Sequence, residues 1–258
     1  MSDRNAERRN TKRLVHCSVE GGVATITLDS PSNRNALSRQ LLEELHVALD
    51  RAQQSDVRAI VLTHTAPAFC AGADLKERRS ADGSAIATSS SLMVRAIERL
   101  GTGNAPTIAA VAGPARAGGV GLMAACDLVV VHPSVTFAFT EVRIGVAPAI
   151  ISVPILARCG WSKLAASFLT GEAFDAATAR DMGLVTHVAD DVAATVGNLV
   201  GGILAGGPNA VAATRRILRG AASNMSEMQA LSEKLFNSAE AAEGMRAFAT
   251  KSPPAWTA

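Results

Sequence analysis

The sequence predicts an α/β protein with a helical C-terminal region, and three observations support this fold class. From residue 14 to residue 131, β-rich runs alternate with stretches of helical periodicity, an order typical of α/β cores. From residue 191 onward the pattern is helical only. Hydrophobic residues make up 48% of the 258-residue chain, enough to fill a large core. We therefore expect a core over residues 14–190, a helical region over residues 191–258 and a flexible basic tail over residues 1–13.

The expected strands are short runs rich in β-branched and apolar residues. They cover residues 14–19, 23–28, 59–63, 107–111 and 127–131. The first two are separated by Glu20-Gly21-Gly22 and predict a hairpin, because glycine readily adopts the positive φ of a tight turn. The later strands are interleaved with predicted helices, which repeats a strand-helix-strand order.

The expected helices carry apolar residues at intervals of three and four. They cover residues 39–52, about 91–100, a segment from about 119, and then 192–205, 208–218, 227–238 and 240–248. The first is the clearest, because Leu41, Leu45 and Ala48 repeat along one face and Ser38 can cap its start. By contrast, the Ser, Ala, Asp and Gly residues of positions 80–91 predict a mobile surface loop.

Composition and charge argue against several classes of function. The net charge is +2, and five of the 25 basic residues lie in the first 13 positions, so the basic character belongs to a tail. Aromatic residues make up 3% of the chain and tyrosine is absent, which leaves few side chains for stacking on bases. We expect no nucleic-acid partner. No apolar run approaches the about 18–20 residues of a membrane span, so we expect no membrane association either.

The four cysteines and five histidines are scattered singly along the chain. None of their spacings matches a zinc site, a redox motif or a pair of metal-binding histidines on one helix face. We therefore expect reduced thiols, no metal and a cytoplasmic protein.

Two segments of small residues give the first indication of a binding site. Phe69-Cys70-Ala71-Gly72-Ala73-Asp74-Leu75-Lys76 follows a predicted strand, and its small side chains let a ligand approach the main chain closely. Residues 111–122 also follow a strand and open an apolar helix, whose first N–H groups have no partner within the helix. Neither segment contains the Gly-Lys-Ser/Thr of a P-loop, so a phosphate cradle is not expected.

Together with several further motifs in the same order, these two segments resemble the enoyl-CoA hydratase/isomerase family. The further motifs are residues 28–38, 139–145, 169–172, 177–185, 243–245 and 253–256. The resemblance covers nearly the whole chain. It implies the crotonase-type fold, an α/β spiral of ββα units, with a helical C-terminal region that forms a homotrimer or a dimer of trimers.

The resemblance also implies that the substrate is an acyl-CoA thioester, with CoA as part of the substrate and no separate cofactor. The main-chain N–H groups of Ala73 and Gly118 would then hold the thioester oxygen. Two fixed donors at about 3 Å stabilise the negative charge of an enolate as it forms. Ala71 matches the position whose carbonyl meets the adenine. The residues expected to contact CoA are Arg34, Ala36, Ala71, Asp74, Leu75, Lys76, Phe248 and Lys251.

One carboxylate, that of Glu141, matches a catalytic acid of the family. Hydratases of the family use a second glutamate on the helix that follows the oxyanion-hole glycine, and Gly121 stands at the matching position. A carboxylate that faces an apolar pocket has a raised pKa and can exchange protons with a substrate. The alternative role for Glu141 is a surface ion pair with Arg143.

We expect an enoyl-CoA hydratase that works with Glu141 alone. An enoyl-CoA double-bond isomerase stays open as an alternative, because one acid is enough to move a proton between two carbons of an enoyl chain. A non-catalytic acyl-CoA-binding protein is the third possibility, since Gly121 replaces the first acid.

Overall fold

The computed structural model describes residues 12–54, 56–80, 82–221 and 224–257, so the predicted tail, residues 1–13, lies almost wholly outside the described residues. The strands are β1 Val15–Glu20, β2 Val23–Leu28, β3 Ala59–His64, β4 Thr107–Val111, β5 Ala115–Arg116, β6 Leu128–Val131, β7 Thr136–Ala138, β8 Phe174–Asp175 and β9 His187–Val188. The α-helices are α1 Arg39–Ala52, α2 Leu75–Ser80, α3 Gly83–Gly101, α4 Gly118–Ala125, α5 Ala149–Cys159, α6 Trp161–Thr170, α7 Ala176–Met182, α8 Val192–Ala205, α9 Pro208–Arg216, α10 Met225–Phe236 and α11 Ala239–Thr250.

Two sheets organise the core. The larger has the order β1-β2-β3-β4-β6-β9, in which β1 and β2 are antiparallel and the other neighbours are parallel. The predicted hairpin is confirmed, and Gly21 and Gly22 form its turn with φ of 54° and 76°. The smaller sheet has the order β5-β7-β8. Its short strands place the segment around Arg116 next to the one that leads to Glu141.

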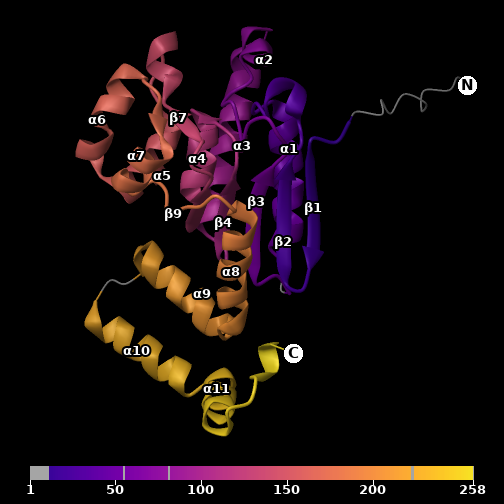
Figure 1. Cartoon of the computed structure of the whole chain (residues 1–258), viewed down its shortest axis with the longest axis vertical. Helices are drawn as coiled ribbons and strands as arrows, with labels where there is room; N and C mark the ends of the chain where they lie inside the picture. Colours follow the sequence, from indigo (N-terminus) through magenta and orange to yellow (C-terminus); the bar gives the residue numbers. More distant parts are fainter. Residues whose placement is uncertain (1–11, 55, 81, 222–223, 258) are drawn as a thin grey trace, which may run out of the picture.

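The two faces of the larger sheet are covered by different helices (Figure 1). Ile60 and Leu62 on β3 point into the main core with the buried faces of α1, α3 and α4. Val61 on the same strand points the other way and packs with Val196 and neighbouring apolar residues of α8. This alternation is the period-2 pattern of a strand that is buried on both sides.

The helices of the C-terminal region are confirmed to within a few residues. Figure 1 shows α9, α10 and α11 extending away from the sheet, while α8 lies against it. The region that starts at residue 191 is therefore joined to the core through α8, and its use in oligomerisation stays a prediction. No helix in the described residues has both the length and the apolar character needed to cross a membrane.

The loop predicted over positions 80–91 is wrong, because α3 already begins at Gly83. The side chain of Asp82 caps this helix by accepting a hydrogen bond from the N–H of Ala85 at 2.9 Å. The C-terminal half of the helix packs against the core, where Leu92, Met93 and Ala96 are buried. Packing of that end overrides the low intrinsic helix preference of the serines before it.

The helices α5, α6 and α7 and the smaller sheet were not among the predicted elements. The strands of that sheet are two or three residues long, so they carry almost no periodic signal. They matter for the site because α5 forms one side of the cavity described below.

Candidate active site

The two small-residue segments lie side by side and are held by main-chain hydrogen bonds. The N–H of Arg116 donates to the carbonyl of Cys70 at 2.9 Å, and the N–H of Phe69 donates to the carbonyl of Pro114 at 3.1 Å. On the other side, the N–H of Leu37 donates to the carbonyl of Gly72 at 2.7 Å. The turn that contains Gly72 is thus fixed between two other segments.

Glycine is required where these turns touch. Gly72 has a φ of +87°, and a Cβ built on it would lie 2.9 Å from Cβ of Ala117 and 3.6 Å from the backbone nitrogen of Gly118. A Cβ built on Gly119 would lie 2.6 Å from Cβ of Cys70. Any side chain at either position would push the two turns apart, so the small residues allow a main-chain contact.

The amides of Ala73 and Gly118 have the properties of an oxyanion hole. Both residues line one cavity. In the described part of the chain, neither N–H donates a hydrogen bond. Gly118 is the first residue of α4, where an N–H has no acceptor within the helix and the helix dipole favours negative charge. Two free donors beside one cavity can stabilise an oxygen that becomes negatively charged.

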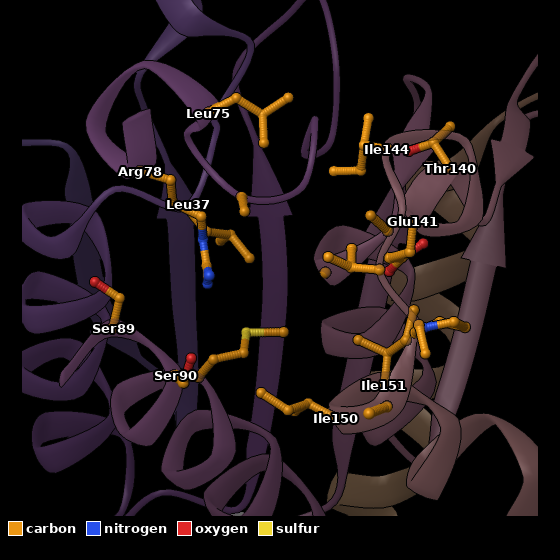
Figure 2. A pocket seen from close by; sticks show the side chains of 18 of the residues that line it. Leu37, Leu75, Arg78, Ser89, Ser90, Thr140, Glu141, Ile144, Ile150 and Ile151 are labelled. Atoms are coloured by element: carbon orange, nitrogen blue, oxygen red, sulfur yellow. The ribbon is translucent and has the colours of Figure 1, made fainter. Parts of the chain in front are cut away.

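The cavity has a volume of about 350 Å³ and is lined mainly by apolar side chains. Those that form its walls include Leu37, Leu42, Met93, Ile144, Ile150 and Ile151. They come from the segment before α1, from α1 and α3, and from the region between Thr140 and α5 (Figure 2). Such a cavity suits a short apolar group next to a polar reacting atom.

Glu141 faces this cavity from a short 3-10 helix, Thr140–Ile144. Burial raises the pKa of its carboxyl, against a smaller lowering effect from a hydrogen bond with its own backbone. Its Oε2 atom is buried and has no hydrogen-bond partner among the described residues. The alternative ion pair with Arg143 is not formed, because the Arg143 side chain instead donates to the carbonyl of Thr170 at 3.0 Å. A half-buried carboxyl that has one unpaired oxygen and a raised pKa is suited to proton transfer.

Gly121 does not leave an empty space where the matching glutamate would stand. A Cβ built on Gly121 would lie 2.4 Å from Cγ2 of Ile151, so the isoleucine of α5 fills the position. Ile151 is buried and also lines the cavity. The cavity wall next to α4, which begins with the amide of Gly118, is therefore apolar here.

The residues predicted to contact CoA are only partly brought together. Ala71 and Leu75 line the cavity. Arg34 is exposed and its carbonyl accepts from the N–H of Ala71 at 3.0 Å, while Ala36 is buried. Both lie in the segment beside the Gly72 turn.

Asp74 and Lys76 lie at the start of α2. One oxygen of the Asp74 carboxylate accepts from the N–H of Lys76 at 3.0 Å, and the other from the Asn33 side chain at 3.1 Å. Asp74 therefore caps the helix and ties it to the Arg34 segment, and the side chain of Lys76 is exposed.

Phe248 and Lys251 lie far from the cavity within one chain. Figure 1 shows α11 at the opposite end of the molecule from α2. Phe248 is 88% exposed there, and Lys251 caps the helix with a φ of 51°. Neither residue lines the cavity of its own chain.

Besides Thr140, which lies in the motif of residues 139–145, three polar residues of the cavity were not predicted, namely Arg78 on α2 and Ser89 and Ser90 on α3. Ser89 and Ser90 precede the buried Met93 by about one helical turn, so extension of the predicted helix toward its N-terminus would have placed them on the cavity side. The orientation of Arg78 depends on the six-residue helix α2, which has no periodic signal of its own.

The buried cysteines are not reactive groups. Burial raises the pKa of Cys70 and of Cys126 to about 12, which keeps both thiols protonated and unreactive. Among the described residues, no group of three or more His, Cys, Asp or Glu side chains could hold a metal ion.

Comparison with known proteins gives a consistent result. The model of the family described as enoyl-CoA hydratase/isomerase matches residues 18–258. "Probable enoyl-CoA hydratase echA8" of Mycobacterium bovis is 35% identical over 246 residues, which are 91% of this chain and 94% of that protein. "Enoyl-CoA isomerase/hydratase fer4" of Mycosarcoma maydis is 33% identical over 65% of each chain. A crystal structure from Legionella pneumophila, described as an enoyl-CoA hydratase/isomerase (crotonase), aligns with a TM-score of 0.89 and 29% identity. The alignment covers 95% of this chain and all of that one.

Proposed function

The chain belongs to the enoyl-CoA hydratase/isomerase family and has the crotonase fold, and we propose that it hydrates a 2-enoyl-CoA with Glu141 as its single acid and base. One observation carries the proposal. The unpaired amides of Ala73 and Gly118 and the carboxylate of Glu141, whose Oε2 atom is unpaired, all line one largely apolar cavity.

The two amides are proposed to bind the thioester oxygen. When a nucleophile adds to the double bond of a 2-enoyl thioester, an electron pair moves through carbon two toward this oxygen. Two fixed N–H donors then stabilise the enolate, and loss of one such donor typically costs about 3 kcal/mol of the barrier. Since main-chain hydrogen bonds hold both turns, the donors are already oriented before the reaction.

Glu141 is proposed to move the proton. In hydration, its carboxylate accepts a proton from a water molecule as the water oxygen bonds to carbon three. The electron pair of the double bond forms the enolate, and protonated Glu141 then returns the proton to carbon two. The product is a 3-hydroxyacyl-CoA, and Glu141 ends as the carboxylate it was at the start. The raised pKa of Glu141 favours both halves of this cycle near neutral pH.

A double-bond isomerase is the second candidate, and the contact between Gly121 and Ile151 favours it. The position where a second carboxylate could hold water is filled by the isoleucine. In isomerisation, Glu141 would remove a proton from carbon two of a 3-enoyl-CoA and return it to carbon four, while the double bond moves to carbons two and three. This reaction needs no bound water, so an apolar wall suits it.

Contact with CoA is proposed for residues from two copies of the chain. Arg34, Ala36, Ala71, Asp74, Leu75 and Lys76 lie in two adjoining segments next to the cavity. Phe248 and Lys251 would come from a neighbouring subunit of a trimer or of a dimer of trimers. Exposed apolar side chains on the C-terminal helices, including Phe236 and Met245, support such an assembly.

The experiment is to incubate the purified protein separately with a 2-enoyl-CoA and a 3-enoyl-CoA and to separate the products. Hydration yields a 3-hydroxyacyl-CoA from the 2-enoyl substrate, whereas isomerisation yields a 2-enoyl-CoA from the 3-enoyl substrate. Acyl-CoA binding without turnover of either substrate would identify a non-catalytic binding protein. Loss of either activity in Glu141→Gln, with binding retained, would support the role of the carboxylate.

A further inference from the structure

One wall of the cavity carries polar side chains that the proposed reaction does not use. Arg78, Ser89 and Ser90, which we call the polar wall, line the same cavity as Glu141. Figure 2 shows them on the side opposite Glu141. Among the described residues that line the cavity, Arg78 is the one cation and Glu141 the one carboxylate.

The donors of the polar wall have no partners within the described part of the chain. Neither the guanidinium of Arg78 nor the hydroxyls of Ser89 and Ser90 form a hydrogen bond there, and Arg78 is in no ion pair. All three residues are partly buried. Their polar atoms are open to the cavity and are not among the buried atoms without a partner. A ligand in the cavity that carries hydrogen-bond acceptors can therefore pair with them.

The acidic residues nearest to Arg78 in the chain bind other groups. Asp74, four residues earlier, accepts hydrogen bonds from Asn33 and from the N-terminal amides of α2. Glu77 accepts a hydrogen bond from the N–H of Arg39 at 2.9 Å. The positive charge of Arg78 is therefore available to the cavity.

We propose that the polar wall binds a carboxylate at the far end of the acyl group, so that the substrate is a CoA thioester of a dicarboxylic acid. This proposal rests on the proposed function, because it assumes that the thioester oxygen lies at Ala73 and Gly118. A carboxylate accepts hydrogen bonds and donates none, which matches a wall made of a guanidinium and two hydroxyls. The planar guanidinium can bind both carboxylate oxygens at once.

The polar wall lies about one helical turn from a methionine beside Gly118, a spacing that suits a short acyl chain. Cε of Met93 lies 3.5 Å from a Cβ built on Gly118. This methionine therefore lies beside one of the two residues whose amides are proposed to bind the thioester oxygen. Ser89 and Ser90 precede Met93 by about one turn of α3, a rise of about 5.4 Å. In a five-carbon diacid, four bonds of about 1.5 Å separate the two carboxyl carbons, so an extended chain spans about 5 Å.

The test compares two thioesters of equal chain length, glutaryl-CoA and pentanoyl-CoA, which differ by the terminal carboxylate. Their affinities are measured by calorimetry for the wild-type chain and for Arg78→Gln, Arg78→Lys and Arg79→Gln. Arg79 is the matched control, because it is exposed on the same helix and does not line the cavity. Both ligands are saturated, so binding is measured without turnover.

We expect the wild-type chain to bind glutaryl-CoA about ten- to hundredfold more tightly than pentanoyl-CoA, the usual range for a charged hydrogen-bonded pair. Arg78→Gln should lose this preference by weakening glutaryl-CoA binding alone. Arg78→Lys should keep part of the preference, and Arg79→Gln should keep all of it.

Two results would overturn the proposal while leaving the proposed function intact. An equal loss for both ligands in Arg78→Gln would assign Arg78 to the phosphates of CoA, which both thioesters share. A wild-type preference for pentanoyl-CoA would show that the wall does not accept a carboxylate. If the wild-type chain binds neither thioester, the proposed function fails and this proposal fails with it.

Discussion

Ile151 occupies the space beside Gly121, so that a Cβ atom at residue 121 would lie 2.4 Å from its Cγ2 and 2.9 Å from its Cβ. Gly121 belongs to α4, which begins at Gly118, and Ile151 belongs to α5, which forms one side of the cavity. A side chain at residue 121 and an isoleucine at residue 151 therefore exclude each other. A glutamate at residue 121 would therefore also require a smaller residue at position 151 or a shift of one of the two helices.

Gly121→Glu alone should destabilise the protein by about 1–3 kcal/mol or more, because overpacking forces the helices apart. Gly121→Glu with Ile151→Ala should be more stable than the sum of the single effects predicts, by about 1–2 kcal/mol, since the clash is relieved. Urea unfolding of the four forms measures this coupling. Gly197→Ala on α8 is the control, because a Cβ there meets nothing within 4 Å.

The same double variant tests the hydratase proposal. If residue 121 matches the missing acid, Gly121→Glu with Ile151→Ala should hydrate a 2-enoyl-CoA at least about tenfold faster than Ile151→Ala. Equal rates in the two folded variants would contradict the assignment of this position.

Glu141→Gln should lower turnover by about 10²–10⁴-fold while changing acyl-CoA affinity by no more than a few-fold, because the amide keeps the shape but cannot carry the proton. Turnover begins with the ionised carboxylate, so kcat/KM of the wild-type chain should rise with pH through the pKa of Glu141. Since burial raises this pKa, the midpoint should lie above the value of about 4.3 for an ordinary glutamate. A midpoint at the ordinary value would contradict the effect of burial.

Glu141→Gln should also stabilise the fold at neutral pH. The pKa of Glu141 is higher in the folded than in the unfolded chain, so ionisation opposes folding. This penalty is absent below the pKa of the unfolded chain, grows as the pH rises from that value to the folded pKa, and is constant above it. The gain in melting temperature should therefore be present at pH 7 and vanish as the pH falls toward 4. A gain that is constant with pH would have another cause.

The parts of the fold that were predicted from the sequence are those with strong local signals. Gly21-Gly22 predicted the hairpin, and Ser38 marked the start of α1, whose cap is formed by a 3.2 Å hydrogen bond to the N–H of Leu41. The elements between residues 132 and 190 were not predicted. Their short strands are fixed by pairing with distant segments, as Ala115 with Phe137, and such contacts leave no periodic pattern.

The candidate site shows the same limit. Ala73, Gly118 and Glu141 were selected because their motifs resemble a family, and the structure places all three around one cavity. The polar wall could not be predicted in this way. Arg78 reaches the cavity because Asp74 caps α2 in one orientation, and Ser89 does so because α3 begins earlier than its composition suggests.

Gly72→Ala should lower both stability and activity. The φ of +87° costs a residue with a side chain about 1–2 kcal/mol, and the added Cβ would lie 2.9 Å from Cβ of Ala117. Displacement of the adjacent amide of Ala73 should reduce kcat/KM by about 10²-fold. Gly160→Ala is the control, because Gly160 has a φ of +70° with open space around it and lies outside the cavity. If both variants lose activity equally, the cause is backbone strain in general and not displacement of the Ala73 amide.

Asp127→Ala should be the most destabilising of these changes. The Asp127 carboxylate binds the guanidinium of Arg215 at 2.6 Å and that of Arg219 at 2.7 Å, and the Arg215 side chain is only 4% exposed. Removal of the acid leaves a buried cation without its counter-charge, which typically costs about 3–5 kcal/mol.

The location of this pair makes the effect specific. Arg215 also donates to the carbonyls of Leu100 and Thr102 at 2.7 Å, so it joins α9 to the end of α3. Loss of Asp127 should therefore increase hydrogen exchange in α9 and at the end of α3 before it affects the β1–β2 hairpin. Glu43→Ala is the control, because its pair with Arg39 is exposed on one helix and should contribute about 0.3–0.5 kcal/mol. A loss from Asp127→Ala no larger than that from Glu43→Ala would show that the buried pair does not hold the C-terminal helices to the core.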